Sequence, residues 1–122
     1  MGQSIVVLEG DPKVAQRMAD GLRSHFPSVL VTGSRDELRN KVASNSTEAV
    51  ILDIEASRLS DVASLHRDFP ALPIVCTHRV PDEEMWMAAL QAGATDVCAA
   101  SDVENLLSSV LRSVAGRHGA VA

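Results

Sequence analysis

The sequence of 122 residues contains no tyrosine, and its only aromatic side chains are Phe26, Phe69 and Trp86. Proteins that bind single-stranded nucleic acid stack bases on aromatic side chains, of which this chain has few. Its 11 basic residues are outnumbered by 16 acidic ones, and the net charge is −5 at pH 7. Because nucleic acids and anionic membranes attract basic surfaces, we expect direct contact with neither.

Long apolar runs and paired cysteines are also missing. No run approaches the ~20 apolar residues that cross a bilayer, and the first residues do not resemble a secretory signal. The two cysteines, Cys76 and Cys98, lie in apolar segments and form no CxxC pair. We therefore expect buried, reduced thiols in a cytoplasmic protein, without a disulfide or a zinc site.

The regular pattern in the chain is an alternation of short and long segments. Runs rich in β-branched residues occupy positions 4–8, 29–32, 49–54, 73–77 and 96–100, and stretches of helical periodicity follow each of them. Nearly continuous apolar runs are typical of strands that helices cover on both faces. The pattern predicts one α/β domain over residues 1–122, a doubly wound parallel sheet of five strands, with residues 115–122 as a tail or the stump of a linker.

Several helix ends carry local signals. Asp11 followed by Pro12 is typical of an N-cap and the first helical residue. Gly93 is typical of a C-cap. Two capping boxes, in which a serine and a glutamate three residues later cap the backbone, are predicted at residues 34–37 and 101–104.

Carboxylates lie where strands end. In an open parallel sheet, ligands bind outside the carboxyl ends of the strands. Asp53 closes one apolar run and Glu9 follows another, which is costly for a carboxylate that is neither solvated, paired nor coordinating. The pair predicts a weak Mg²⁺ site, with Asp11 as a further candidate ligand. Helix capping, or pairing with arginine, remains the alternative reading.

Four segments carry a family resemblance: residues 7–12 (VLEGDP), 49–53 (AVILD), 72–77 (LPIVCT) and 91–97 (QAGATDV). Together they resemble the receiver domain of bacterial two-component response regulators, over essentially the whole chain. The resemblance implies a flavodoxin-like fold with strand order 2-1-3-4-5. It also implies phosphoryl transfer from a phosphohistidine to Asp53, with Glu9 as an acidic ligand of Mg²⁺.

The sequence departs from the family's pattern at the site. The second acid falls on Gly10, the lysine that ends the fifth strand falls on Ala100, and the aromatic switch of that strand falls on Val97. The hydroxyl residue is ambiguous, because Thr77 comes one residue early and His78 stands at the expected place. Both are therefore candidates for the residue that contacts the phosphoryl group.

These departures favour an atypical receiver that is not an enzyme and acts through protein–protein contacts. Asp53 is the acceptor if phosphorylation occurs, and the expected partner is a histidine kinase, a phosphotransfer protein or another signalling protein. One alternative is a conventional Mg²⁺-dependent, phosphorylated response regulator. A more remote one is a small phosphohydrolase with Asp53 as nucleophile, because residues 53–57 are weakly similar to the nucleophile motif of the haloacid-dehalogenase family.

Positive charges near the strand ends could replace the missing lysine. His78 and Arg79 leave the fourth strand at the same edge, and Lys13 follows Asp11 by two residues. We expect His78 or Arg79 to neutralise Asp53, the alternative being solvated loop charges that contribute little.

The segment 84–90 (EMWMAAL) is apolar around most of a helix, whereas a surface helix has one apolar stripe. Met87 and Leu90 suit the core face, which leaves Met85 or Trp86 turned outward. Tryptophan and methionine are favoured at binding surfaces, so these two are the predicted interface residues. By resemblance, a homodimer through the fourth helix, fifth strand and fifth helix is one option. Trp86 folded onto the core is the alternative.

Overall fold

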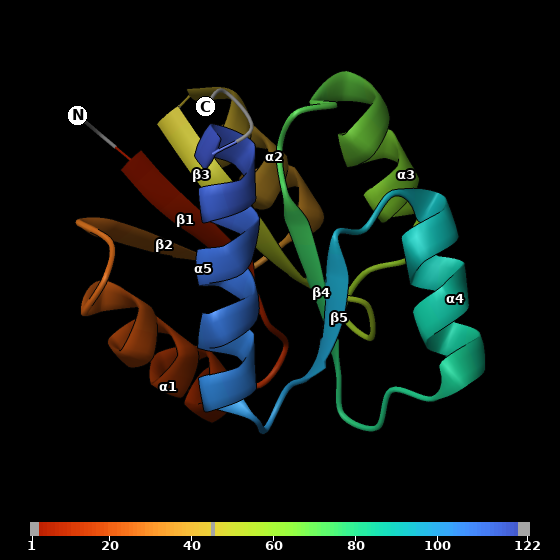
Figure 1. Cartoon of the computed structure of the whole chain (residues 1–122). Helices are drawn as coiled ribbons and strands as arrows, with labels where there is room; N and C mark the ends of the chain where they lie inside the picture. The colour runs from red at the N-terminus through yellow and green to blue at the C-terminus, as the bar shows by residue number, and fades with distance from the viewer. Residues whose placement is uncertain (1–2, 45, 120–122) are drawn as a thin grey trace.

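A computed structural model describes residues 3–44 and 46–119. Within these residues, five strands alternate with five helices (Figure 1). The strands are β1 (Gln3–Leu8), β2 (Ser28–Thr32), β3 (Ser46–Asp53), β4 (Ile74–His78) and β5 (Asp96–Ala99). The helices are α1 (Pro12–Arg23), α2 (Arg35–Ser44), α3 (Leu59–Asp68), α4 (Glu83–Ala92) and α5 (Val103–Gly119).

All neighbouring strands are parallel, and their order is β2-β1-β3-β4-β5. This confirms the predicted fold class and strand order. Helices α1 and α5 cover one face of the sheet, and α2, α3 and α4 cover the other (Figure 1). The carboxyl ends of β1, β3, β4 and β5 therefore open at one edge, between the two layers of helices.

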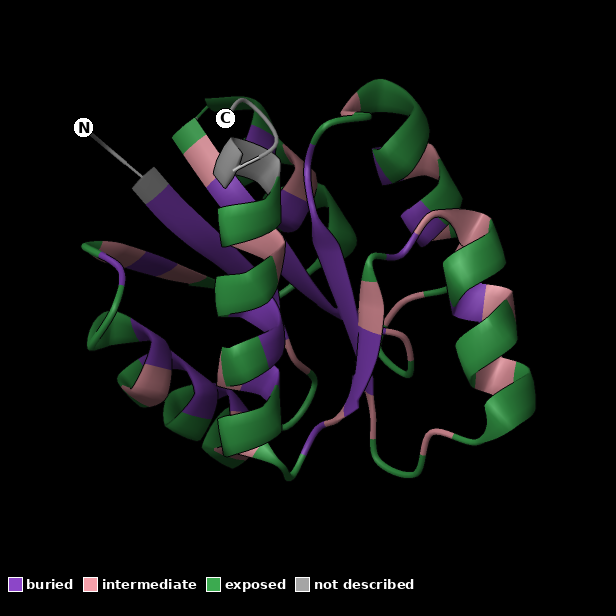
Figure 2. Cartoon of the chain, viewed as in Figure 1, coloured by how far each residue is buried: buried purple, intermediate pink, exposed green. Residues whose placement is uncertain are grey.

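The core consists of two apolar layers, one on each side of the sheet (Figure 2). Successive residues of a strand point to opposite faces, so Ile5 and Val7 pack under α1 and α5, and Val6 packs on the opposite side. Cys76 and Cys98 are buried, as predicted, and they lie in different layers on opposite faces of the sheet. Burial raises the pKa of the Cys76 thiol to about 12, so this thiol stays protonated and unreactive.

Two predicted caps are confirmed. The Asp11 carboxylate accepts a hydrogen bond from the backbone N–H of Lys13 (2.9 Å) at the start of α1. Gly93 ends α4 at φ 117°, in the left-handed region.

The capping box at residues 34–37 is confirmed in part. The Ser34 hydroxyl accepts from the Glu37 N–H (3.1 Å), but the Glu37 carboxylate accepts from the N–H of Gly33. The box at residues 101–104 was wrong, because the Asp102 carboxylate caps α5 and accepts from the N–H of Asn105 (3.1 Å). The N–H of Asp102 donates to the carbonyl of Ala99 (3.1 Å) in a turn that contains Ser101. Ser101 therefore lies one residue before the position that caps the helix.

Helix α5 continues to Gly119, so residues 115–119, which we expected in a tail, belong to the helix. Residues 120–122 of that tail lie outside the described residues. Within the described part, no helix is both long and apolar enough to cross a bilayer.

Replacing Gly93 with alanine should destabilise the domain by about 1–2 kcal/mol or more, because L residues avoid this φ. The added Cβ would also lie 2.6 Å from the ring of His66 in α3. The free energy of unfolding in urea measures the loss. Gly116→Ala is the control: it meets no atom within 4 Å and lies inside α5, where alanine is favoured. Equal stabilities of the two variants would contradict the assigned strain.

Candidate functional site

A cavity of about 500 Å³ opens at the carboxyl edge of the sheet, beside the end of β3. Asp53, the last residue of β3, is only 5% exposed, although it is a carboxylate. The lining comes from the ends of β1, β3, β4 and β5 and from the first turn of α1: Glu9, Gly10, Asp11, Val14, Asp53, Glu55, Ala56, Arg79, Ala100 and Ser101. The sheet thus brings together Glu9 and Asp53, as predicted from their positions after two strands.

Backbone amides hold the Asp53 carboxylate in place. Its Oδ2 accepts from the N–H of Gly10 (2.9 Å), and its Oδ1 accepts from the N–H of Glu55 (2.8 Å). The first contact needs a close approach of the two chains, because a Cβ on Gly10 would lie 3.3 Å from Asp53 Oδ2. Gly10 therefore serves as a donor to Asp53, at the position where the family resemblance implied a second acid.

Glu9 and Asp53 interact unfavourably as two carboxylates in one partly buried site. Burial, and then the nearby charge of Asp53, raise the pKa of Glu9 to about 7, against the lowering effect of a hydrogen bond from the N–H of Asp11 (3.0 Å). Glu9 Oε1 is buried and has no hydrogen-bond partner. No cationic side chain of the described residues forms an ion pair with Glu9 or Asp53, and when Glu9 is protonated it can itself donate a hydrogen bond to Asp53.

A small cation fits this donor set, since oxygen ligands and an unsatisfied carboxylate oxygen are what Mg²⁺ takes. Glu9 and Asp53 would hold it, and the ion would supply positive charge toward the oxygens of an incoming phosphoryl group. Asp11 is committed to capping α1. In the described part of the chain, no three histidine, cysteine or acidic side chains are arranged to share a metal ion. The site therefore offers two carboxylate ligands, as many as hydrated Mg²⁺ commonly takes.

The register of the sheet distinguishes Thr77 from His78. Asp53 pairs directly with Thr77, so the two side chains project from the same face of the sheet. Thr77 is fully buried, and its hydroxyl has no hydrogen-bond partner. His78 instead uses its Nδ1 to accept from the N–H of Val80 (3.0 Å). The geometry therefore favours Thr77 as the hydroxyl that belongs to the Asp53 site.

The expectation that His78 or Arg79 neutralises Asp53 was wrong. Both face Glu55: Arg79 Nε lies 3.0 Å and His78 Nε2 lies 3.8 Å from Glu55 Oε2. The N–H of Arg79 also donates to Glu55 (2.9 Å), and these contacts hold the pKa of Glu55 below its usual range. Glu55 thus joins the β3–α3 and β4–α4 loops, a role for which its position in the sequence gave no signal. Lys13 is exposed, and no residue of the described ranges forms an ion pair with Asp53.

The two remaining positions of the family pattern are small and apolar. Ala100, where the resemblance implied a lysine, is 6% exposed and lines the cavity. Val97, where it implied an aromatic switch, is buried in the layer under α4. Neither side chain can donate a hydrogen bond to a ligand of Asp53.

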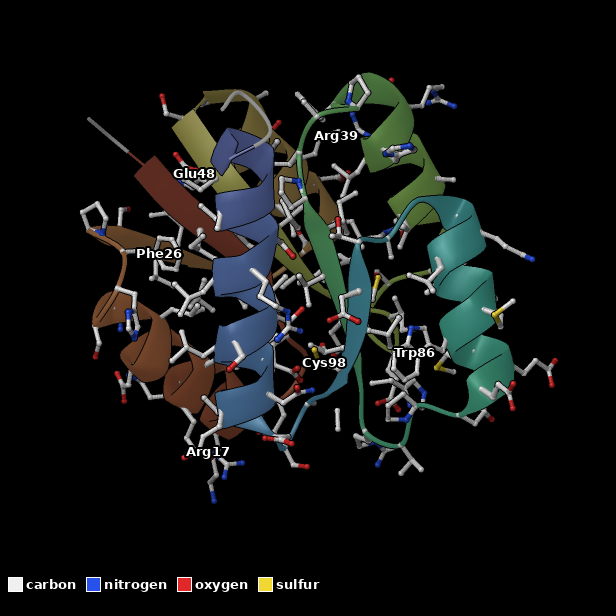
Figure 3. The ribbon with its side chains drawn as sticks, in the orientation of Figure 1. Arg17, Phe26, Arg39, Glu48, Trp86 and Cys98 are labelled. Atoms are coloured by element: carbon white, nitrogen blue, oxygen red, sulfur yellow. The ribbon has the colours of Figure 1, made fainter. Side chains whose placement is uncertain are left out.

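Helix α4 carries the most exposed apolar surface near the site. Trp86, Met87 and Leu90 are 45%, 53% and 40% exposed, and together with Pro81, Asp82 and Glu83 they line a shallow groove, which we call the α4 groove. In Figure 3 the indole of Trp86 projects from α4 toward the side on which β5 lies.

The exposed position of Trp86 agrees with its predicted outward orientation. Met85 is half-buried, and the expectation that Met87 and Leu90 face the core was wrong. Ala89, which is fully buried, follows Met85 by four residues, so this pair marks the inner side of α4. Met87 and Leu90 consequently belong to the outer side.

The parallel α/β sheet with an acidic site at its carboxyl edge was compared with solved structures to identify its fold. The fold of this chain is that of response-regulator receiver domains. No protein-family model matches the sequence, and no curated protein is significantly similar to it.

Two solved structures illustrate the likeness. The N-terminal signal receiver domain of a two-component response regulator from Bacteroides fragilis superposes with a TM-score of 0.84 at 21% identity, over 93% of this chain and 98% of that one. A CheY-like response regulator receiver domain protein from Methanospirillum hungatei JF-1 gives 0.85 at 14% identity, over 98% of both chains. Identities this low establish the fold alone.

Glu9→Gln should make the domain more stable than wild type at pH 8, with a smaller difference at pH 5. A carboxyl whose pKa rises on folding binds its proton more tightly in the folded state. Wild type therefore loses stability as the pH rises from the ordinary pKa of glutamate, about 4.3, to about 7, and the amide removes this loss.

Urea unfolding of both proteins at pH 5 and pH 8 tests this prediction. Glu84→Gln, on the exposed first turn of α4, is the control and should not change the difference between the two pH values. The same pH dependence in Glu9→Gln and wild type would show that Glu9 does not titrate abnormally.

Proposed function

We propose that this chain is a signalling receiver domain that acts mainly through protein–protein contacts, with Asp53 as a phosphorylation site of low efficiency. The observation that carries the proposal is the absence, within the described residues, of a cationic side chain facing Asp53. A charge-assisted hydrogen bond to a phosphoryl oxygen contributes roughly 1.5–3 kcal/mol, and Ala100 cannot make one. A phosphorylated state would therefore be formed less readily and be stabilised less.

Asp53 nevertheless keeps the chemistry of an acceptor. Its carboxylate is oriented by two amides, and Glu9 beside it supports a weak Mg²⁺ site. In the transfer, an Asp53 oxygen would bond to phosphorus as the bond from phosphorus to the donor's leaving group breaks. The expected donors are a histidine kinase or a phosphotransfer protein. This chemistry transfers a group to the domain itself, so we propose a signalling domain and not an enzyme.

The α4 groove is the proposed contact surface. Trp86, Met87 and Leu90 supply exposed apolar area, and the acidic first turn of α4 supplies negative charge at its edge. A second copy of this chain would bring two acidic turns together, which disfavours a homodimer. A signalling partner with an apolar surface bordered by lysine or arginine complements the groove in both respects.

Phosphorylation can be tested with Mg²⁺, acetyl phosphate and intact mass measurement. Wild type is expected to remain unmodified under conditions in which Ala100→Lys gains one phosphoryl group. The added lysine can donate a charged hydrogen bond to a phosphoryl oxygen, which corresponds to an increase of about tenfold or more in the phosphorylated fraction. Gain of a phosphoryl group by wild type, lost in Asp53→Asn, would contradict the proposal that phosphorylation is inefficient.

Fluorescence tests the exposure of the proposed contact surface, because Trp86 is the only tryptophan. Neutral acrylamide should quench its emission more effectively than iodide, since Asp82 and Glu83 line the same groove and repel an anion. Added salt should reduce the difference in quenching between acrylamide and iodide, because it screens the repulsion between iodide and the acidic side chains. An indole that neither agent quenches would remove Trp86 from the contact surface.

A further inference from the structure

The polar groups beside Asp53 that lack a partner can all accept a hydrogen bond from a donor. We propose that it binds an organic cation, a primary alkylammonium group, whose nitrogen donates hydrogen bonds to Glu9 and Asp53 and whose alkyl chain lies against Ala100. The proposal shares the Asp53 site with the proposed function, and ligand binding would then be an input to the same signalling domain. It does not require that Asp53 be phosphorylated.

The first support is the buried oxygen Oε1 of Glu9. The other oxygen of this carboxylate accepts from the N–H of Asp11, whereas Oε1 has no partner. An ionised carboxylate only accepts hydrogen bonds, so a ligand that satisfies Oε1 must be a hydrogen-bond donor or a cation. An anion cannot supply this contact, and a cation that carries N–H groups can.

An independent support comes from Thr77, which is fully buried and has an unpartnered hydroxyl. Thr77 pairs with Asp53 in the neighbouring strand and therefore projects from the same face of the sheet, at the level of the Asp53 carboxylate. A primary ammonium has three N–H donors. Glu9 and Asp53 line the cavity and offer it two acceptors, and the Thr77 hydroxyl lies behind the lining, next to Asp53 in the sheet.

The chain does not fill this place itself. Arg79 lines the cavity, but its guanidinium pairs with Glu55 at 3.0 Å. Ala100 ends at Cβ and leaves open the side of the cavity where a longer residue would reach inward. Among the described residues, no other lysine, arginine or histidine lines the cavity.

The walls favour an alkyl cation over a bare metal ion as the main ligand. Val14, Ala56 and Ala100 give the cavity apolar lining, against which an alkyl chain can pack but a hydrated metal ion gains nothing. The volume of about 500 Å³ lies within the range of ~300–1,000 Å³ typical of small-molecule sites. A short-chain primary amine matches both the acidic and the apolar part of the lining.

Thermal unfolding of the full chain at pH 8 with n-butylammonium chloride tests the proposal. A ligand that binds only the folded state raises the midpoint temperature as its concentration increases. The rise should saturate with n-butylammonium. Tetramethylammonium, which has the same charge and no N–H donor, should produce none at equal ionic strength. Glu9→Gln should raise the half-saturating concentration of butylammonium about tenfold or more, as expected for loss of a charged hydrogen bond.

The Ala100→Lys variant places an ammonium group inside the cavity, so it should lose the response to butylammonium. Ser108→Lys adds the same charge at an exposed position of α5 outside the cavity and should retain it. Isothermal titration of wild type provides a measurement that does not depend on the folding of any variant.

Three results would overturn the proposal: an equal effect of both ammonium ions, an unchanged half-saturating concentration in Glu9→Gln, or an unchanged response in Ala100→Lys. Because acetyl phosphate labelling is measured by mass without amine, failure of this proposal and failure of the proposed function are separable.

Discussion

The repulsion between the carboxylates of Glu9 and Asp53 constrains everything else at the functional edge of the sheet. Parallel pairing of β1 with β3 places both acids at adjacent strand ends. The backbone N–H groups of Gly10 and Asp11 each donate to only one oxygen of these carboxylates. Residues 5–8 of β1 and 49–52 of β3 are buried, so these strands cannot shift without exposing two apolar layers. The fold therefore keeps the two carboxyl groups together, and the raised pKa of Glu9 records the cost of ionising both of them.

This constraint unifies features that are unrelated in sequence. The raised pKa of Glu9 and the small side chain of Ala100 belong to one cavity, and the unpartnered hydroxyl of Thr77 lies beside Asp53 in the sheet behind it. Arg79, the nearest candidate, is used by Glu55 to join two loops. The second of those loops leads directly into α4, so the cavity and the α4 groove are neighbours along the chain.

Much of the fold could be predicted because its determinants are local. Apolar runs marked all five strands, and Asp11 and Gly93 marked helix ends through backbone chemistry that acts over a few residues. The convergence of Glu9 and Asp53 followed from the rule for parallel sheets. The partners of Arg79 and the orientation of Met87 were not predictable in this way, because each depends on the approach of segments that are distant in sequence. Glu55 competes for Arg79, and the rotation of α4 is set by the burial of Ala89.

The most direct test of this account is a ¹³C NMR titration of the Glu9 side-chain carboxyl in wild type and in Ala100→Lys. The account predicts a midpoint near pH 7 in wild type and a lower midpoint in the variant, because an ammonium beside Glu9 favours its charged form. A wild-type midpoint near the ordinary value of about 4.3, unchanged by the lysine, would contradict the claim that this site is short of a positive charge.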